Sequence, residues 1–262
     1  MSNIRVSIRC NIFCFWNRRR IFNNTFDFHS FLNVTGPLAV ASSIGQIPFT
    51  ALSGIIKYAK KNKVNFKYAF LLSLGSIPTS QFLANILANS ENNILGKINV
   101  YKNLTLGDFL IIFTFIIVVG GTGIYNILKS NKNITNNNFR ILKCHKIYTL
   151  IVGALFGFFS VLLGIGGGFL STPYFIYYCR FTSIEAVATT LTVLFITSTI
   201  TTIYYLLEKQ IYFLISLIIA IGGIIGAQLG SSLALKLSQE KILLYLGYLQ
   251  ILAVIFYIIS KI

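Results

Sequence analysis

Long apolar stretches separated by short polar segments dominate the pattern of this chain. Seven of them carry few or no charged side chains, near 37–56, 68–88, 108–128, 147–164, 186–207, 211–235 and 242–260. A helix rises about 1.5 Å per residue and the hydrocarbon core of a bilayer is about 30 Å thick, so each stretch is long enough to cross it with modest tilt. The pattern predicts an all-α polytopic membrane protein with about seven transmembrane helices.

The run from Ile147 to Cys179 is too long for one crossing and contains no charged side chain. As a single helix it would measure roughly 50 Å. Residues that are costly in a helix interior gather in it, namely Gly164, Gly166, Gly167, Gly168 and Pro173. These residues mark where the run bends or breaks. A broken helix at membrane depth survives only beside protein or a watery cavity, so we expect a broken or re-entrant segment that lines a binding site.

Composition supports a membrane protein. Only 11% of the 262 residues are charged and 55% are hydrophobic, whereas a soluble domain carries about 25% charged residues. The net charge of +16 comes from Lys and Arg in short loops between apolar runs. This placement is typical of positive residues retained on the cytoplasmic side, and it disfavours a nucleic-acid partner. The expected partners are the lipid bilayer and a small substrate.

The loops divide the chain into four parts. Lysines crowd the loop after the first span, and Lys and Arg crowd the loop of 129–146, so both loops are expected in the cytoplasm. Residues 31–128 then form a first transmembrane repeat and 147–262 a second. The basic segment 1–30 matches neither a signal peptide nor a span, and we interpret it as lying outside the fold.

An internal repeat connects the two halves. A shift of 147 residues aligns Ala39–Ser43 with Ala186–Thr190, Gly75 with Gly222, and Gln81 with Gln228. Such repeats are common in secondary transporters. The short glycine-rich segment favours a dip without crossing, which would make the halves parallel; a full crossing would make them inverted. The first half lacks a glycine-rich span, so we interpret its start as truncated, replaced or a coding-frame artefact.

The motifs resemble those of the sulfite exporter TauE/SafE family. The resemblance rests on Gly157-Phe158-Phe159-Ser160-Val161-Leu162-Leu163-Gly164-Ile165-Gly166-Gly167-Gly168-Phe169 leading to Pro173, on Ala186–Thr190, and on the glycines of 222–230. It covers about residues 35–262. The resemblance implies a multi-pass transporter of small, often sulfur-containing anions such as sulfite and sulfonates. The missing first glycine-rich span departs from the family pattern.

The glycine run suggests how an anion would bind. Where Gly166 to Gly168 unwind the helix, backbone N–H groups become free, and a half-helix starting near Phe169 or Thr172 would point its positive end at the gap. The alternative is close helix packing through small residues.

Six further residues are candidates for the substrate site. Thr189 and Thr190, with Ser42 and Ser43 at the matched positions, would offer hydroxyls to the substrate or bond back to their own helices. Gln81 and Gln228 would either converge on the substrate or hold helices together. No cofactor and no metal site is expected.

Other chemistries find little support. The spans hold no paired carboxylates, no histidine and no nucleophile–base arrangement, so an enzyme is disfavoured. The four cysteines are scattered and are expected to be free thiols. The leading hypothesis is a transporter or exporter of small anions in the bacterial inner membrane, working by alternating access. The alternative is a truncated, non-transporting remnant or membrane assembly partner. The oligomeric state does not follow from the sequence.

Overall fold

The computed structural model describes residues 36–88, 99–101, 104–105, 113–130, 144–164, 166–209 and 211–261. Apart from turns and connections, this part of the chain is helical except for a short antiparallel pair of strands, β1 (Asn99–Tyr101) and β2 (Leu104–Thr105), which the all-α prediction did not include. The predicted N-terminal segment 1–30 and most of the predicted loop 129–146 lie outside the described residues.

A helix lies at the position of each predicted span. The helices are α3 (Gly36–Ala59), α4 (Phe66–Ala88), the π-helical η4 (Ile116–Gly120) continued by α6 (Gly121–Ser130), α7 (Lys146–Leu163), α9 (Ser183–Leu207), α10 (Phe213–Ala234) and α11 (Gln239–Lys261). A shorter helix, α8 (Gly168–Tyr177), follows the glycine run. Five segments of the described part are long and apolar enough to cross a membrane; α3 and α4 are not among the five.

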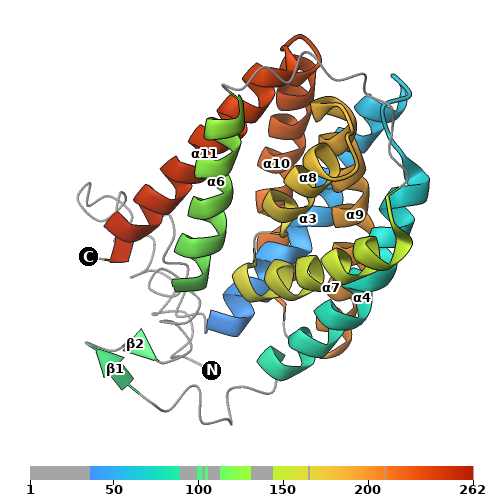
Figure 1. Cartoon of the computed structure of the whole chain (residues 1–262). Helices are drawn as coiled ribbons and strands as arrows, with labels where there is room; N and C mark the ends of the chain where they lie inside the picture. Colours follow the sequence, from blue (N-terminus) through green and yellow to red (C-terminus); the bar gives the residue numbers. More distant parts are fainter. Residues whose placement is uncertain are drawn as a thin grey trace, which may run out of the picture.

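Helix α9 lies at the centre of the bundle. It packs against α3, α4, α8 and α11, while α3 also packs against α10, α4 against α7, and α6 against α11 (Figure 1). The start of α9 is fixed by a capping box, in which Thr182 Oγ1 accepts from the backbone N–H of Glu185 and the Glu185 carboxylate accepts from that of Thr182. Hydroxyl side chains of α9 are buried among its neighbours rather than turned outward, which suits a central helix in an apolar surrounding.

Several helix ends meet at one end of the bundle, formed by residues 60–65, 144–146, 178–183 and 235–240. Lys63 forms an ion pair with Glu185 at 3.6 Å, and the ring of Tyr68 packs edge-on against Phe181. The Ser183 hydroxyl donates to the carbonyl of Gln239. Most lysines and arginines of the described part gather here, at positions 57, 60, 61, 63, 67, 129, 146, 180, 236 and 241. We call it the Lys-rich end.

The chain returns to the Lys-rich end through α8, so α7 and α8 form a re-entrant hairpin. Helix α9 therefore starts at the end where α3 finishes, and these two helices run antiparallel. Two contacts fix this direction: Asn65 N–H, beyond the end of α3, donates to Thr189 near the start of α9, and Tyr212 N–H, beyond the end of α9, donates to Ser42 near the start of α3. The predicted parallel arrangement of the halves is wrong, because it counted 147–164 as a full crossing followed by a separate dip, whereas α7 and α8 together leave and return to the same end.

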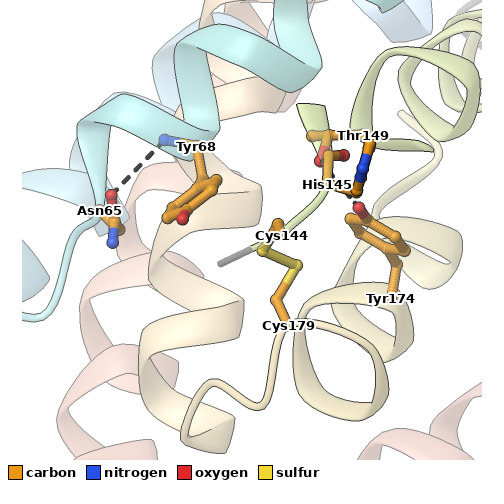
Figure 2. The surroundings of a disulfide bond; sticks show 7 residues. All are labelled: Asn65, Tyr68, Cys144, His145, Thr149, Tyr174 and Cys179. Atoms are coloured by element: carbon orange, nitrogen blue, oxygen red, sulfur yellow. Dashed lines mark hydrogen bonds between the residues drawn. A yellow bond between two sulfur atoms is a disulfide. The ribbon is translucent and has the colours of Figure 1, made fainter. Parts of the chain in front are cut away.

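A disulfide closes the base of the hairpin. Cys144, just before α7, is bonded to Cys179, just after α8, with a Cα–Cα distance of 5.2 Å (Figure 2). The prediction of free thiols is wrong for this pair; Cys10 and Cys14 lie outside the described residues. Cys144 and Cys179 are 35 residues apart in the sequence, and that spacing matches no known motif. Only the return of α8 brings their two sulfur atoms together.

Candidate functional site

The break between α7 and α8 is built from glycines in a left-handed backbone conformation. Gly164 ends α7 with φ +65°, Gly166 has φ +84°, and Gly167 precedes α8 with φ +57°. L side chains rarely adopt these angles. A Cβ on Gly166 would also lie 2.9 Å from the side chain of Leu194 and 3.0 Å from that of Ile47. The backbone conformation therefore favours glycine here, whereas the two close atoms are the ends of flexible side chains that can move aside.

The break lies midway along its neighbouring helices. Ile47 is near the middle of α3 and Leu194 is near the middle of α9, and both face Gly166. In a bundle that crosses a bilayer this depth corresponds to the midplane, where secondary transporters place their substrates. Interrupted helix at such a depth needs protein or water to satisfy its backbone. Here Ser43 supplies one partner, since its hydroxyl donates to the carbonyl of Gly164 at 2.8 Å.

The N-terminus of α8 points at this interruption. Its N-cap residue, Gly167, makes no side-chain capping hydrogen bond, and the first helical residue is Gly168. The first N–H groups of a helix lack partners within the helix and carry the positive end of its dipole. The predicted half-helix start near Phe169 is thus close to the observed one. Pro173, expected to mark the break, lies inside α8 instead.

Three hydroxyls gather where α8 meets α9. Ser171 Oγ donates to Thr190 Oγ1 at 3.1 Å, and Thr172 Oγ1 lies 3.3 Å from the same oxygen. The Thr172 hydroxyl donates its hydrogen to the carbonyl of Gly168 at 2.8 Å. All three side chains are buried. Of these, the sequence singled out Thr172 and Thr190 but not Ser171, although Ser171 lies in the same run.

The remaining predicted residues lie away from the break. Ser42 accepts from Tyr212 N–H at the start of α10, and Thr189 accepts from Asn65 N–H at the Lys-rich end. The Gln228 amide donates to both the carbonyl and the hydroxyl of Ser53, joining α10 to α3. Gln81 lies on α4, and its buried Nε2 has no hydrogen-bond partner.

Apolar side chains cover the break on the side of η4 and α11. Leu163, the last residue of α7, and Phe169 of α8 pack against a cluster of Phe115, Val119 and Val254. No charged side chain was expected deep in a span, and in the described helices the charged residues occupy terminal turns. A ligand at the break would therefore meet backbone dipoles and hydroxyls instead of a counter-charge. The sequence did not identify this cover, because nothing in it relates η4 to the glycine run.

The base of the hairpin is rigidly held. Beside the disulfide, Tyr174 of α8 and Thr149 of α7 share a hydrogen bond of 2.8 Å between their hydroxyls (Figure 2). The ring of Tyr174 also stacks on that of Tyr178 at 5.3 Å between centroids. The disulfide and the hydrogen bond join the start of α7 to the end of α8 at the Lys-rich end. They therefore restrict how far the two helices can separate at the break.

Comparison with known proteins identifies the family. Residues 28–257 match the family described as sulfite exporter TauE/SafE, which confirms the resemblance seen in the motifs. The chain is 24% identical over 228 residues to the probable membrane transporter protein YunE of Bacillus subtilis, covering 85% of this chain and 81% of that protein. It is 27% identical over 232 residues to a probable membrane transporter protein of Xylella fastidiosa, covering 88% and 83%. No solved structure matches the chain.

Proposed function

This chain belongs to the sulfite exporter TauE/SafE family of multi-pass membrane transporters, and we propose that its substrates are small anions such as sulfite and sulfonates. The observation that carries the proposal is the interrupted helix midway through the bundle, with the N-terminus of α8 aimed at the gap. Helix N-termini bind anions through free N–H groups and the helix dipole. The anion would be bound by backbone groups of the glycine run, Gly164, Gly166, Gly167 and Gly168. It would also be bound by the hydroxyls of Thr172, Thr190 and Ser43.

Close packing alone does not account for these glycines. Gly75, Gly153 and Gly157 show what packing requires: each has an ordinary helical backbone and lies against the backbone of the opposing helix, α4 or α7. Gly164, Gly166 and Gly167 differ, because their positive φ angles interrupt the helix. Interrupting the helix leaves backbone N–H and C=O groups without helical partners at this depth, which is costly and which packing does not need. The interruption therefore supports a role in binding.

We infer that the two halves are inverted repeats. Helix α3 contacts α10 where Gly223 faces Thr50, and α4 contacts α9 where Ser76 and Thr197 share a hydrogen bond. A shift of 147 residues relates Thr50 to Thr197 and Ser76 to Gly223, so the two contacts are equivalent. Together with the antiparallel α3 and α9, this supports alternating access by rocking of one half against the other about the central break.

The charge distribution gives an orientation in the bacterial inner membrane. Most lysines and arginines of the described part lie at the Lys-rich end, whereas Lys209 and Lys261 lie at the opposite one. The positive-inside rule therefore places the Lys-rich end in the cytoplasm, where the Cys144–Cys179 bond would be exposed to a reducing environment. The N-terminus of α8 would then lie at the level of the gap and face away from the cytoplasm.

Efflux measurements test the proposal. Cells that produce the full-length protein should export sulfite or a sulfonate faster than cells without it. Gly167→Leu should abolish this export at an unchanged amount of protein in the membrane, since the side chain is strained at positive φ and a Cβ already lies 3.0 Å from the Phe156 carbonyl. Gly226→Leu is the matched control, because a Cβ there meets nothing within 4 Å.

Two results would count against the proposal. Export that persists in Gly167→Leu would make the break a packing feature. Equal export with and without the protein, across a panel of small anions, would favour the non-transporting alternative.

A further inference from the structure

The Cys144–Cys179 bond lies at the Lys-rich end, which the charge distribution places in the cytoplasm. Thiols are kept reduced in that compartment, and the disulfides that do form in its proteins are mostly transient and serve catalysis or redox sensing. One cysteine precedes α7 and the other follows α8, so both are outside the membrane-spanning helices. A bond in this place is therefore expected to open and close during the life of the protein.

The two arms of the re-entrant hairpin rest on different helices. Helix α7 packs on α4, where Gly153 lies against the backbone of Leu72. Helix α8 packs on α9, where the Ser171 hydroxyl donates to that of Thr190. The disulfide joins the two arms where they come together at the Lys-rich end (Figure 2). It therefore ties a helix seated on α4 to a helix seated on α9.

A packed apolar cluster fills the bundle between the break and the Lys-rich end. Phe156 of α7, Phe175 of α8 and Val193 of α9 belong to it, and so do both cysteines of the disulfide. At its inner limit, atoms of Phe156 lie within 3.2 Å of the position that a Cβ on Gly167 would take. Packed interiors leave few voids larger than a water molecule. An anion can therefore pass between the cytoplasm and the break along α8 only if this cluster opens.

The surroundings of the disulfide suit thiol–disulfide exchange. Lys146 lies two residues after Cys144 and Arg180 directly after Cys179, and both of these cationic side chains are exposed. Cationic neighbours favour the thiolate, which is the form that takes part in exchange. Arg180 also has φ +56°, a left-handed angle that a non-glycine residue adopts at a cost, so local opening of this turn relieves it. Cys144 is 5% exposed and Cys179 0%, so a thiol reaches Cys144 first.

We propose that Cys144 and Cys179 form a redox latch on the re-entrant hairpin, closed as a disulfide and open as two thiols. The closed latch holds the ends of α7 and α8 together and keeps the apolar cluster shut toward the cytoplasm. When the latch opens, the hydrogen bond between the hydroxyls of Thr149 and Tyr174 is left to link these ends, so α8 can move away from α7 and admit an anion to the break. The latch rests on the proposed function and orientation.

Opening of the latch uses thiols of the cytoplasm as the reductant. A thiolate of a low-molecular-weight thiol or of a protein dithiol attacks Cys144 Sγ, the S–S bond breaks, and Cys179 leaves as a thiolate that takes up a proton. A second thiolate then attacks the mixed disulfide and releases Cys144. Two electrons and two protons pass to the pair, while two thiols become one disulfide, and the reverse exchange closes the latch.

Export by the full-length protein in liposomes tests the latch, in a Cys10→Ser, Cys14→Ser background that leaves only these two of the four cysteines. Methanesulfonate is the probe, because sulfite itself cleaves disulfides. Export should be several-fold faster after reduction with dithiothreitol than after oxidation with diamide. Cys144→Ser and Cys179→Ser are the matched variants. Neither can form the bond, so each should export at the reduced rate under both treatments.

Hydrogen exchange gives a readout that does not depend on transport. Reduction should speed exchange at the backbone amides of α8 and leave that of α10, which packs on α3, unchanged. Thiol trapping adds the state of the pair in the cell. Protein purified in air should carry the bond, whereas in growing cells quenched with acid the pair should be mostly reduced and become bonded after diamide.

The outcomes separate the latch from the function on which it rests. Equal export by the reduced and the oxidised protein, with the change of thiol state seen by gel shift, overturns the latch while the transporter stands. A pair that stays bonded in growing cells is a permanent staple, which also overturns it. If neither form exports any anion of the panel, the proposed function fails. Faster exchange of α8 on reduction would then still support a latch that holds this helix, and unchanged exchange would overturn it as well.

Discussion

Gly157→Ala tests how closely the re-entrant hairpin is packed on its neighbour. Gly157 of α7 lies against the backbone of α4, and a Cβ there would come within 2.8 Å of the Ser76 carbonyl carbon and closer still to its oxygen. Ordinary contact begins at 3.4 Å. A backbone carbonyl inside a helix does not rotate away as a side chain does, so α7 must move away from α4 along the whole interface.

The expected cost follows from two opposed terms. Alanine favours the helix over glycine by about 1 kcal/mol. Overpacking costs up to about 3 kcal/mol, and the rigid carbonyl puts this case at the upper end. The net loss of about 2 kcal/mol corresponds to a fall in Tm of about 4–8 °C for a chain of this size.

A matched substitution separates packing from helix propensity. Gly226→Ala on α10 receives the same gain in propensity, but its Cβ meets nothing within 4 Å, so its Tm should stay the same or rise. The measurement is the size-exclusion profile of the detergent-purified variants after heating at a series of temperatures. A Gly157→Ala protein that is at least as stable as the wild type, or a Gly226→Ala protein that melts equally early, would refute the reasoning.

Three other predictions concern the hairpin, the topology and the start of α9. With the two N-terminal cysteines replaced by serine, Cys144 and Cys179 should resist maleimide in the denatured, unreduced protein and react after reduction, as seen by gel shift; reaction before reduction would contradict the disulfide. In intact cells an impermeant thiol reagent should label Glu208→Cys but not Lys61→Cys, whereas labelling of both would reject the orientation. Thr182→Ala should cost about 1 kcal/mol, or about 2–4 °C in Tm, by removing the α9 cap; an unchanged Tm would show that the cap contributes nothing.

The apolar pattern predicted where helices form, because a stretch without charges has few alternatives in a membrane. The expected spans at 147–164 and 186–207 correspond to α7 and α9 within a few residues. The family was also within reach of the sequence, since the run Gly157 to Phe169 is specific in order and spacing. The direction of the chain was not within reach, because no local pattern shows that 147–164 and the short segment after it form one hairpin. The parallel arrangement was inferred from the shortness of that segment, with 147–164 counted as a full crossing, and was wrong.

The candidate site was predicted only in part. The glycines were identifiable because three in succession are costly in a helix and so need a reason. Two of the candidates, Thr172 and Thr190, contact each other, but Thr189 faces the Lys-rich end, one position and about 100° around the helix from Thr190. Sequence spacing gives the face that a residue occupies, but not which neighbouring helix that face meets.

The sequence by itself determined that this is a membrane protein of the TauE/SafE family with a glycine break in one long apolar run. Burial of charge in hydrocarbon is so costly that composition alone decides the first point, and left-handed backbone is so restricted that glycine decides the second. The tertiary structure alone decided that α8 turns back, that Cys144 meets Cys179, and that Gln228 is paired while Gln81 is not. Each of these depends on contacts between segments far apart in the chain, whose free energies do not appear in any local pattern.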